Sequence, residues 1–184
     1  MTVWVALLRA VNVSGVNRVP MADLRKALTA KGIVGVKTHI QSGNLVFRSD
    51  VAGHLLGALI ADTIHAEFGF RPPVLMLEAF QIQAALAQNP LAKGNADPAH
   101  LHFFFMEKAL PDAAFAFLQS VAAPTEKYAF RGKMLWLDLP EGLGRSKLAR
   151  RVMGLPIDVT ARNLRSVQAI ADLAAGFGTG DAPC

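Results

Sequence analysis

Apolar residues in the first half of the chain alternate between runs of strand length and stripes with helical spacing. A continuous apolar run at Val3–Leu8 predicts a strand that is buried on both faces. From residue 33 to residue 48, apolar and polar residues alternate on either side of Ser42-Gly43-Asn44, which has the composition of a turn. This pattern predicts a β-hairpin.

Two apolar stripes with helical spacing flank this hairpin, one beginning at Pro20 and the other running from Leu55 to Phe68. Proline is well suited to the first position of a helix, because an N–H group at that position would have no hydrogen-bond partner within the helix. A further strand is expected at Val74–Leu77. The order is therefore β-α-β-β-α-β, which is that of the split βαβ, or ferredoxin-like, unit.

The second half predicts a looser copy of the same pattern, β-α-β-β-α followed by one more helix. The expected elements are a helix over 78–88, a linker over 93–99, a strand at 101–106, a helix over 111–123, a hairpin over 128–137, a helix that starts near Arg145 and a last helix capped by Thr160. The predicted fold class is α+β. We expect a ferredoxin-like part at 1–77, a connection at 78–99, a second part at 100–178 packed with the first as one compact unit, and a flexible tail at 179–184.

The composition indicates a folded domain that does not span a membrane. The 52% hydrophobic residues and 18% charged residues are typical of a well-packed domain, and no apolar run approaches the roughly 20 residues that span a bilayer. The N-terminus does not resemble a signal peptide. The one cysteine, Cys184, excludes a disulfide within the chain. We therefore expect a cytoplasmic protein without membrane association.

Positive charge is concentrated in two segments. Residues 1–48 carry a net charge of +6 and residues 131–165 carry +5, whereas residues 49–130 carry −4. If the two basic segments meet, they form one surface that attracts phosphates. The alternative is that each basic segment pairs with the acidic middle of the chain.

Polar residues that could hold a ligand gather in four segments. The candidate ligand-binding residues are Arg9, Asn12, Arg18, Ser42, Asn44, Arg145, Ser146, Lys147, Arg162 and Asn163. Arg145, Lys147 and Arg162 are expected beside helix N-termini, where a cation is unfavourable unless an anion is near. A bound phosphate or carboxylate would offset this unfavourable interaction between the cation and the helix dipole, and so would a carboxylate of the chain such as Asp158 or Glu141.

Six motifs follow one another along the chain, namely Arg9 to Gly15, Val19-Pro20-Met21 with Leu24, Gln41 to Phe47, Asn89-Pro90, Gly144 to Leu148 and Thr160 to Asn163. Together these motifs resemble the bacterial domain-of-unknown-function 1697 family. The family has glycine at the positions of Ala10 and Ser14, an aromatic residue at His39 and tryptophan at Leu164. The resemblance covers about residues 3–176 and implies two α+β parts, the first ferredoxin-like. It implies no activity, cofactor or catalytic residue.

Several chemistries are disfavoured. The chain has no Walker or dinucleotide-binding glycine motif, no nucleophile elbow and no clustered set of metal ligands, so we expect neither a cofactor nor a metal. Phe103-Phe104-Phe105 lacks the basic lead-in of an RNA-binding strand and is expected in the core.

Three functional hypotheses remain. The first is a binding module for a phosphate-bearing ligand, such as a nucleotide, a nucleic acid or a phosphorylated metabolite, in a cleft between the two parts. The second is an enzyme of unknown reaction that uses the same cleft by electrostatic stabilisation. The third is a protein-interaction module in which the motifs are purely structural. The motifs lack groups that titrate near pH 7, which ranks binding above catalysis.

Overall fold

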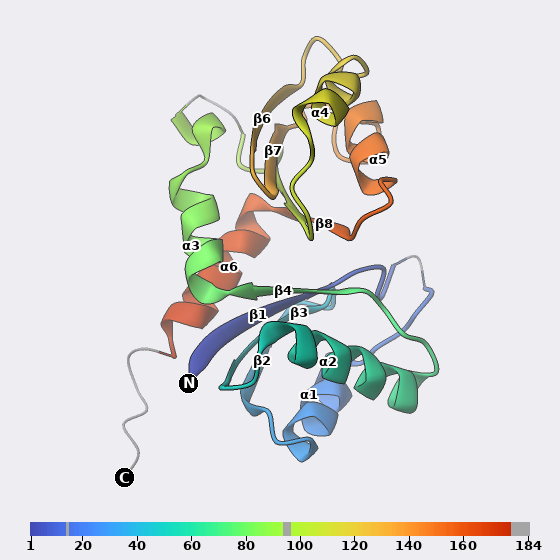
Figure 1. The fold of residues 1–184 in the computed structure, drawn as a ribbon, viewed down its shortest axis with the longest axis vertical. Coiled ribbons are helices and arrows are strands. Elements are labelled where there is room, and N and C mark those ends of the chain that lie inside the picture. The colour runs from blue at the N-terminus through green and yellow to red at the C-terminus, as the bar shows by residue number, and fades with distance from the viewer. Residues whose placement is uncertain (14, 94–96, 178–184) are drawn as a thin grey trace. The chain divides into compact units, whose positions relative to one another are not determined.

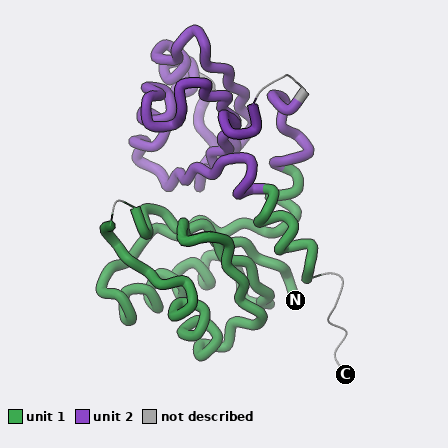
Figure 2. The backbone as a smooth tube through the Cα atoms, turned by 180° about the vertical axis from the view of Figure 1, so that it is seen from behind, with its two compact units in different colours: residues 1–84, 168–184 green, residues 85–167 purple. Residues whose placement is uncertain are grey.

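A computed structural model describes residues 1–13, 15–93 and 97–177, and it divides into two compact units. Unit 1 comprises Met1–Ala84 and Gln168–Cys184, and unit 2 comprises Ala85–Val167 (Figure 2). The chain passes between the units twice, within helix α3 (Ala79–Ala87) and within helix α6 (Leu164–Ala175). None of the helices in the described ranges is both long and apolar enough to cross a membrane.

Unit 1 contains the predicted ferredoxin-like arrangement. Its elements are β1 (Thr2–Leu8), α1 (Met21–Ala30), β2 (Val34–His39), β3 (Asn44–Ser49), α2 (Gly53–Phe68) and β4 (Val74–Glu78). The strands form an antiparallel sheet in the order β2-β3-β1-β4, which places the first strand of the motif at the centre. The predicted strands and helices of this half are thereby confirmed.

Both faces of the unit 1 sheet carry buried side chains. Ala6 pairs with Leu45, and these two residues belong to a core that includes Leu24 of α1 and Ile60 of α2. Figure 1 shows α1 and α2 together against this face of the sheet. On the opposite face Val5 is also fully buried. Burial on both faces explains why β1 reads as a continuous apolar run.

Unit 2 repeats the strand order of unit 1. Its elements are the 3₁₀ helix η1 (Pro90–Lys93), β5 (Leu101–Met106), α4 (Asp112–Gln119), β6 (Lys127–Arg131), β7 (Met134–Asp138), α5 (Lys147–Met153) and β8 (Val159–Asn163). The sheet order is β6-β7-β5-β8, so β5 takes the central place that β1 takes in unit 1. The second part is thus a ferredoxin-like unit as well, and it is closer to the first than its sequence indicates.

One element of unit 2 corrects the sequence interpretation. Thr160 was expected to cap the last helix, but it lies buried in β8, which pairs antiparallel with β5. Helix α6 begins only at Leu164, and the Oδ1 atom of Asn163 accepts a hydrogen bond from the Ser166 N–H at 2.9 Å. Asn163 is therefore the N-cap of this helix.

The phenylalanines of β5 are core residues, as expected. Phe103, Phe104 and Phe105 are each at most 1% exposed. Trp136 of β7 lies opposite Phe103 and donates its indole N–H to the Ala85 carbonyl at 3.0 Å. These buried rings provide no stacking surface for bases. Of the predicted linker at 93–99, residues 94–96 lie outside the described part of the chain, as does the predicted tail at 179–184.

The stability of unit 1 should depend on the glycine at position 43. Its φ is +74°, and a Cβ atom built there would lie 2.5 Å from Val11 Cγ2 and 2.7 Å from Leu8 Cβ. We expect Gly43→Ala to lower the free energy of unfolding by about 3 kcal/mol, because it adds both a strained φ and an overlap. Denaturant unfolding measures this.

The matched control is Gly15→Ala, at φ +78° with no atom within 4 Å of the added Cβ. It should cost only about 1 kcal/mol, the strain of the left-handed backbone alone. Equal losses for the two variants would contradict the role assigned to the close contact.

Candidate functional site

The loop between β1 and α1 is folded through an unusual number of left-handed residues. Ala10, Asn12 and Asn17 have φ values of 56°, 53° and 53°, and Gly15 has a φ of 78°. Val13 and Val16 form an isolated antiparallel bridge, and both side chains are more than half exposed. Non-glycine residues adopt this region only when their surroundings hold them there. The loop is therefore maintained by specific contacts.

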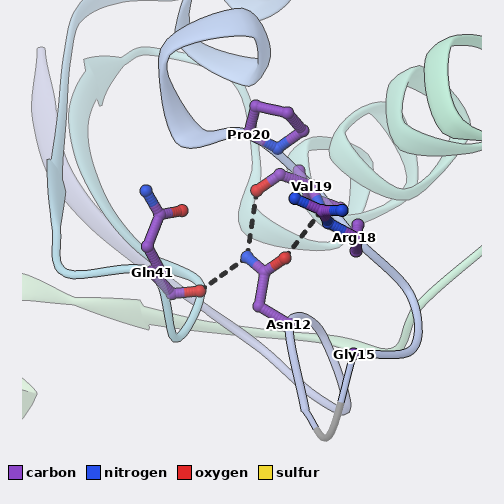
Figure 3. Close-up of a pocket in the computed structure, with 6 residues that line it drawn as sticks. All are labelled: Asn12, Gly15, Arg18, Val19, Pro20 and Gln41. Atoms are coloured by element: carbon purple, nitrogen blue, oxygen red, sulfur yellow. Dashed lines mark hydrogen bonds between the residues drawn. The ribbon is translucent and has the colours of Figure 1, made fainter.

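The side chain of Asn12 supplies three of those contacts (Figure 3). Its Nδ2 atom donates to the Gln41 carbonyl at 2.7 Å and to the Val19 carbonyl at 2.9 Å. Its Oδ1 atom accepts from the Val19 N–H at 2.8 Å. One side chain thus fixes the entry into α1 and connects the loop to the tip of the β2–β3 hairpin. Asn12 therefore bonds the backbone of the protein, and its predicted contact with a ligand stays a prediction.

The polar residues of the hairpin tip also bond within the protein. Asn44 is fully buried, and its Nδ2 atom donates to the His39 carbonyl at 3.1 Å and to Ser42 Oγ at 2.9 Å. The carbonyl of Gly43 accepts from the Leu8 N–H at 2.8 Å. These bonds shape the turn, and Asn44 has no exposed surface to offer a ligand.

A pocket of about 400 Å³ opens between this loop and the hairpin tip. It is lined by Asn12, Gly15, Arg18, Val19, Pro20 and Gln41 (Figure 3). Arg18 and Gln41 are exposed, and none of the lining residues is acidic. Pro20 precedes α1 and offers no side-chain cap to the first N–H groups of the helix. The pocket therefore combines a guanidinium, an amide and a helix N-terminus.

Of the residues that line the pocket, Asn12 and Arg18 were predicted as ligand-binding residues, whereas Gln41 and Pro20 were not. Their adjacency to the Ser42 turn and to α1 was the available signal. Arg9 is half-buried, and its backbone N–H donates to the Pro73 carbonyl at 3.0 Å, beside the edge strand β4.

In unit 2, the segment before α5 satisfies its own polar groups. Ser146 is the N-cap, and its buried Oγ atom accepts from the Ala149 N–H at 3.0 Å. The Arg145 guanidinium is exposed and lies 3.5 Å from Glu141 Oε2, the chain carboxylate considered as an alternative to an anion. Lys147 is exposed at the first position of the helix. The cations at this helix start do not by themselves indicate a ligand.

Arg162 was predicted to lie at a helix start. It lies instead in β8, opposite Phe103 of β5. Its Nη1 atom donates to Thr160 Oγ1 and to the Ala161 carbonyl, both at 2.8 Å. Burial lowers the pKa of its guanidinium to about 10. The argument from an unfavourable helix dipole therefore does not apply to Arg162.

The four predicted segments are distributed over both units. The Arg9–Arg18 loop and the Ser42 turn belong to unit 1, where the Asn12 to Gln41 hydrogen bond joins them. Arg145 and Arg162 belong to unit 2. That these segments share one site with the loop stays a prediction. Among the described residues no group of three or more His, Cys, Asp and Glu is arranged to hold a metal ion.

Comparison with known proteins agrees with the motifs and the fold. The model of a family described as a protein of unknown function, DUF1697, matches residues 1–136. The chain belongs to this family. It is also similar to the solved structure of the conserved bacterial protein SP0830 from Streptococcus pneumoniae, with 28% identity and a TM-score of 0.72 over 94% of this chain and 98% of that one. No curated protein matches the chain.

Asn12→Asp should test the structural role of the amide. The carboxylate keeps the acceptor for Val19 N–H but places an oxygen against the Val19 and Gln41 carbonyls. We expect a loss of about 2–3 kcal/mol in the free energy of unfolding. Asn17→Asp is the control, since Asn17 donates a single bond to the Ala10 carbonyl, and its loss should be about half as large. A neutral Asn12→Asp variant would exclude the proposed role.

Ala10→Gly should stabilise the protein. Ala10 is exposed with φ 56°, and glycine adopts this conformation without strain. We expect a gain of about 0.5 kcal/mol, measured by chemical denaturation, after the added flexibility of the unfolded chain is included. Ala22→Gly on the exposed side of α1 should instead cost about 1 kcal/mol. The idea is wrong if both substitutions destabilise equally.

Proposed function

We propose that the pocket between the β1–α1 loop and the hairpin tip binds a phosphate-bearing ligand, such as a nucleotide, a nucleic acid or a phosphorylated metabolite. The observation that carries the proposal is the exposed Arg18 guanidinium in a pocket that no carboxylate lines. A guanidinium is suited to phosphate because its planar donors match two phosphate oxygens.

Two further features of the pocket favour an anion. The first-turn N–H groups of α1 receive no side-chain cap from Pro20, and a helix N-terminus carries partial positive charge. The Gln41 amide can donate to a phosphate oxygen or to a base edge. Asp23 in the first turn of α1 opposes these groups and partly satisfies the helix dipole. Its exposed position, outside the pocket lining, limits that effect.

Hydrogen bonds already join the two walls of the pocket when no ligand is bound. The Asn12 hydrogen bonds hold the loop and the hairpin tip together, so little conformational freedom is lost on binding. The lining side chains include no general acid or base, so the geometry supports binding better than catalysis.

A second candidate is a protein-interaction module. Val13 and Val16, at the bridged tip of the loop, are 58% and 63% exposed. Exposed branched apolar residues are suited to a small apolar socket on a partner. In that case the loop hydrogen bonds present the two valines.

Arg18→Gln should weaken binding of ATP or of a fluorescent single-stranded oligonucleotide about tenfold or more, because a charge-assisted hydrogen bond is lost. The control is Lys31→Gln, which removes the same charge at the opposite end of α1 and should change affinity far less. Titrations at about 50 and 200 mM salt separate the contribution of phosphate contacts, which falls steeply with salt.

Equal weakening by the two substitutions would mean that general basic charge, not the pocket, attracts the ligand. If neither probe binds at low salt, the proposed binding of a phosphate-bearing ligand is wrong, and the protein-interaction module is the better candidate.

A further inference from the structure

The pocket beside Arg18 lies at one end of the seam where α1 packs beside β2, which we call the α1–β2 seam. The chain turns back between these two elements, and the Ile33 N–H donates to the Leu28 carbonyl at 3.1 Å in that turn. Helix and strand therefore run in opposite directions. At the other end of the seam the start of α1 lies beside the end of β2, where Pro20 and Gln41 both line the pocket.

Arg25 is a second cation on this seam. Its Nη1 atom donates to the Thr38 Oγ1 atom at 2.5 Å, and the side chain is half-buried. Arg25 lies five residues after Pro20, and Thr38 lies three residues before Gln41. The rise of a helix and of a strand places this hydrogen bond roughly 8–10 Å from the pocket. A guanidinium has five N–H donors, so the bond to Thr38 positions the group and leaves other donors for a ligand.

The charge of Arg25 is not balanced by an acid on the seam. The Thr38 hydroxyl is neutral, and Asp23 is the only acidic residue within residues 1–48. Asp23 lies two residues before Arg25, which places it about 160° away around the helix. The other helix on this face, α2, packs beside β4 at the opposite edge of the sheet. Within the described part of the chain, neither Arg18 nor Arg25 forms an ion pair with a carboxylate.

We propose that the ligand of the pocket is a single-stranded nucleic acid, whose phosphodiester backbone runs from Arg18 along the α1–β2 seam to Arg25. This inference rests on the function proposed above and narrows it from any phosphate-bearing ligand to a chain of phosphates. One nucleotide occupies the pocket, with its phosphate at Arg18 and its base edge at the Gln41 amide. A phosphate further along the strand reaches Arg25.

The spacing of the two cations favours a chain over a single nucleotide. A separation of roughly 8–10 Å is too large for one phosphate group to contact both the pocket and the Arg25 guanidinium. The pocket volume of about 400 Å³ suits one small ligand. A base can enter such a pocket only when it is unpaired and unstacked, which favours a single strand over a duplex.

The simpler interpretation is that Arg25 only fastens α1 to β2 through Thr38. Both interpretations predict that loss of Arg25 lowers the stability of unit 1. They differ in what happens to ligands of different length. Only a nucleic-acid site predicts that Arg25 contributes to the binding of an oligonucleotide and not to the binding of a mononucleotide.

The experiment compares thymidine 5′-monophosphate, titrated by ¹H–¹⁵N NMR, with a fluorescent oligothymidylate of about eight nucleotides, titrated by anisotropy. Arg25→Gln should weaken binding of the oligonucleotide about fivefold or more, because a charge-assisted hydrogen bond to phosphate is lost. The slope of its log affinity against log salt should become shallower by about 0.7, the value for one phosphate contact on a single strand. The affinity for the monophosphate should not change.

Two further variants separate the position of the charge from its presence. Lys26→Gln removes the same charge from the next residue, about 100° away around the helix, and should change the oligonucleotide affinity far less. Thr38→Val keeps every charge but removes the hydroxyl that holds the Arg25 guanidinium. It should weaken oligonucleotide binding about threefold, because the guanidinium is no longer held in place. Binding of the monophosphate by each variant shows that the pocket is still folded.

The proposal is overturned if Arg25→Gln weakens both ligands equally, if Lys26→Gln has the same effect as Arg25→Gln, or if a duplex of the same length binds as tightly as the single strand. If Arg25→Gln does not fold, an unchanged oligonucleotide affinity of Thr38→Val overturns it.

Arg18→Gln distinguishes failure of this inference from failure of the proposed function. If Arg18→Gln weakens monophosphate binding while Arg25→Gln leaves the oligonucleotide affinity unchanged, the pocket binds phosphate and only the path along the seam is wrong. If Arg18→Gln weakens binding of neither ligand, the proposed function is wrong and this inference fails with it.

Discussion

The side-chain amide of Asn12 is the contact on which the first unit's loop geometry depends. It bonds both the N–H and the carbonyl of Val19 and also the carbonyl of Gln41, 29 residues further along the chain. The left-handed conformations of Ala10, Asn12 and Asn17 would otherwise relax, because isolated residues do not favour them. The close approach of Gly43 to Leu8 and Val11 then fixes how near the hairpin tip can come. The pocket beside Arg18 is a consequence of these two constraints.

The strands and helices were largely predictable, because burial imposes its period on the sequence. The strand at Leu101–Met106 has the bounds that its apolar run predicts, and both hairpins lie at their predicted turns. Strand β8 was missed for a physical reason. Its alternation of Val159 and Ala161 with Thr160 and Arg162 puts two polar residues on the face that pairs beside Phe103 and Phe105. Threonine and arginine are mostly exposed in proteins, so their presence in this segment did not indicate a buried strand and was interpreted as a helix start.

Two of the predicted segments, the Arg9–Arg18 loop and the Ser42 turn, meet in the structure, but the hydrogen bonds of their residues could not be predicted from the sequence. Asparagine and serine attract notice in a sequence because they bind ligands, yet the same donors and acceptors bond backbone in turns and caps. Asn12, Asn44, Ser146 and Asn163 all do the latter. Spacing along the chain does not distinguish these uses, because the distinction depends on which carbonyls and N–H groups the fold leaves without partners.

The arginines of this protein differ in how deeply their side chains are buried. Arg162 lies within its sheet and bonds its own strand, and its lowered pKa records the cost of removing a charge from water. Arg18 is exposed beside the pocket, so its guanidinium has not been removed from water. A recognition site needs a charge that the fold has positioned but has not neutralised. In unit 1 the loop held by Asn12 positions Arg18 beside the pocket, so the structural role of Asn12 is compatible with the binding role that we propose for Arg18.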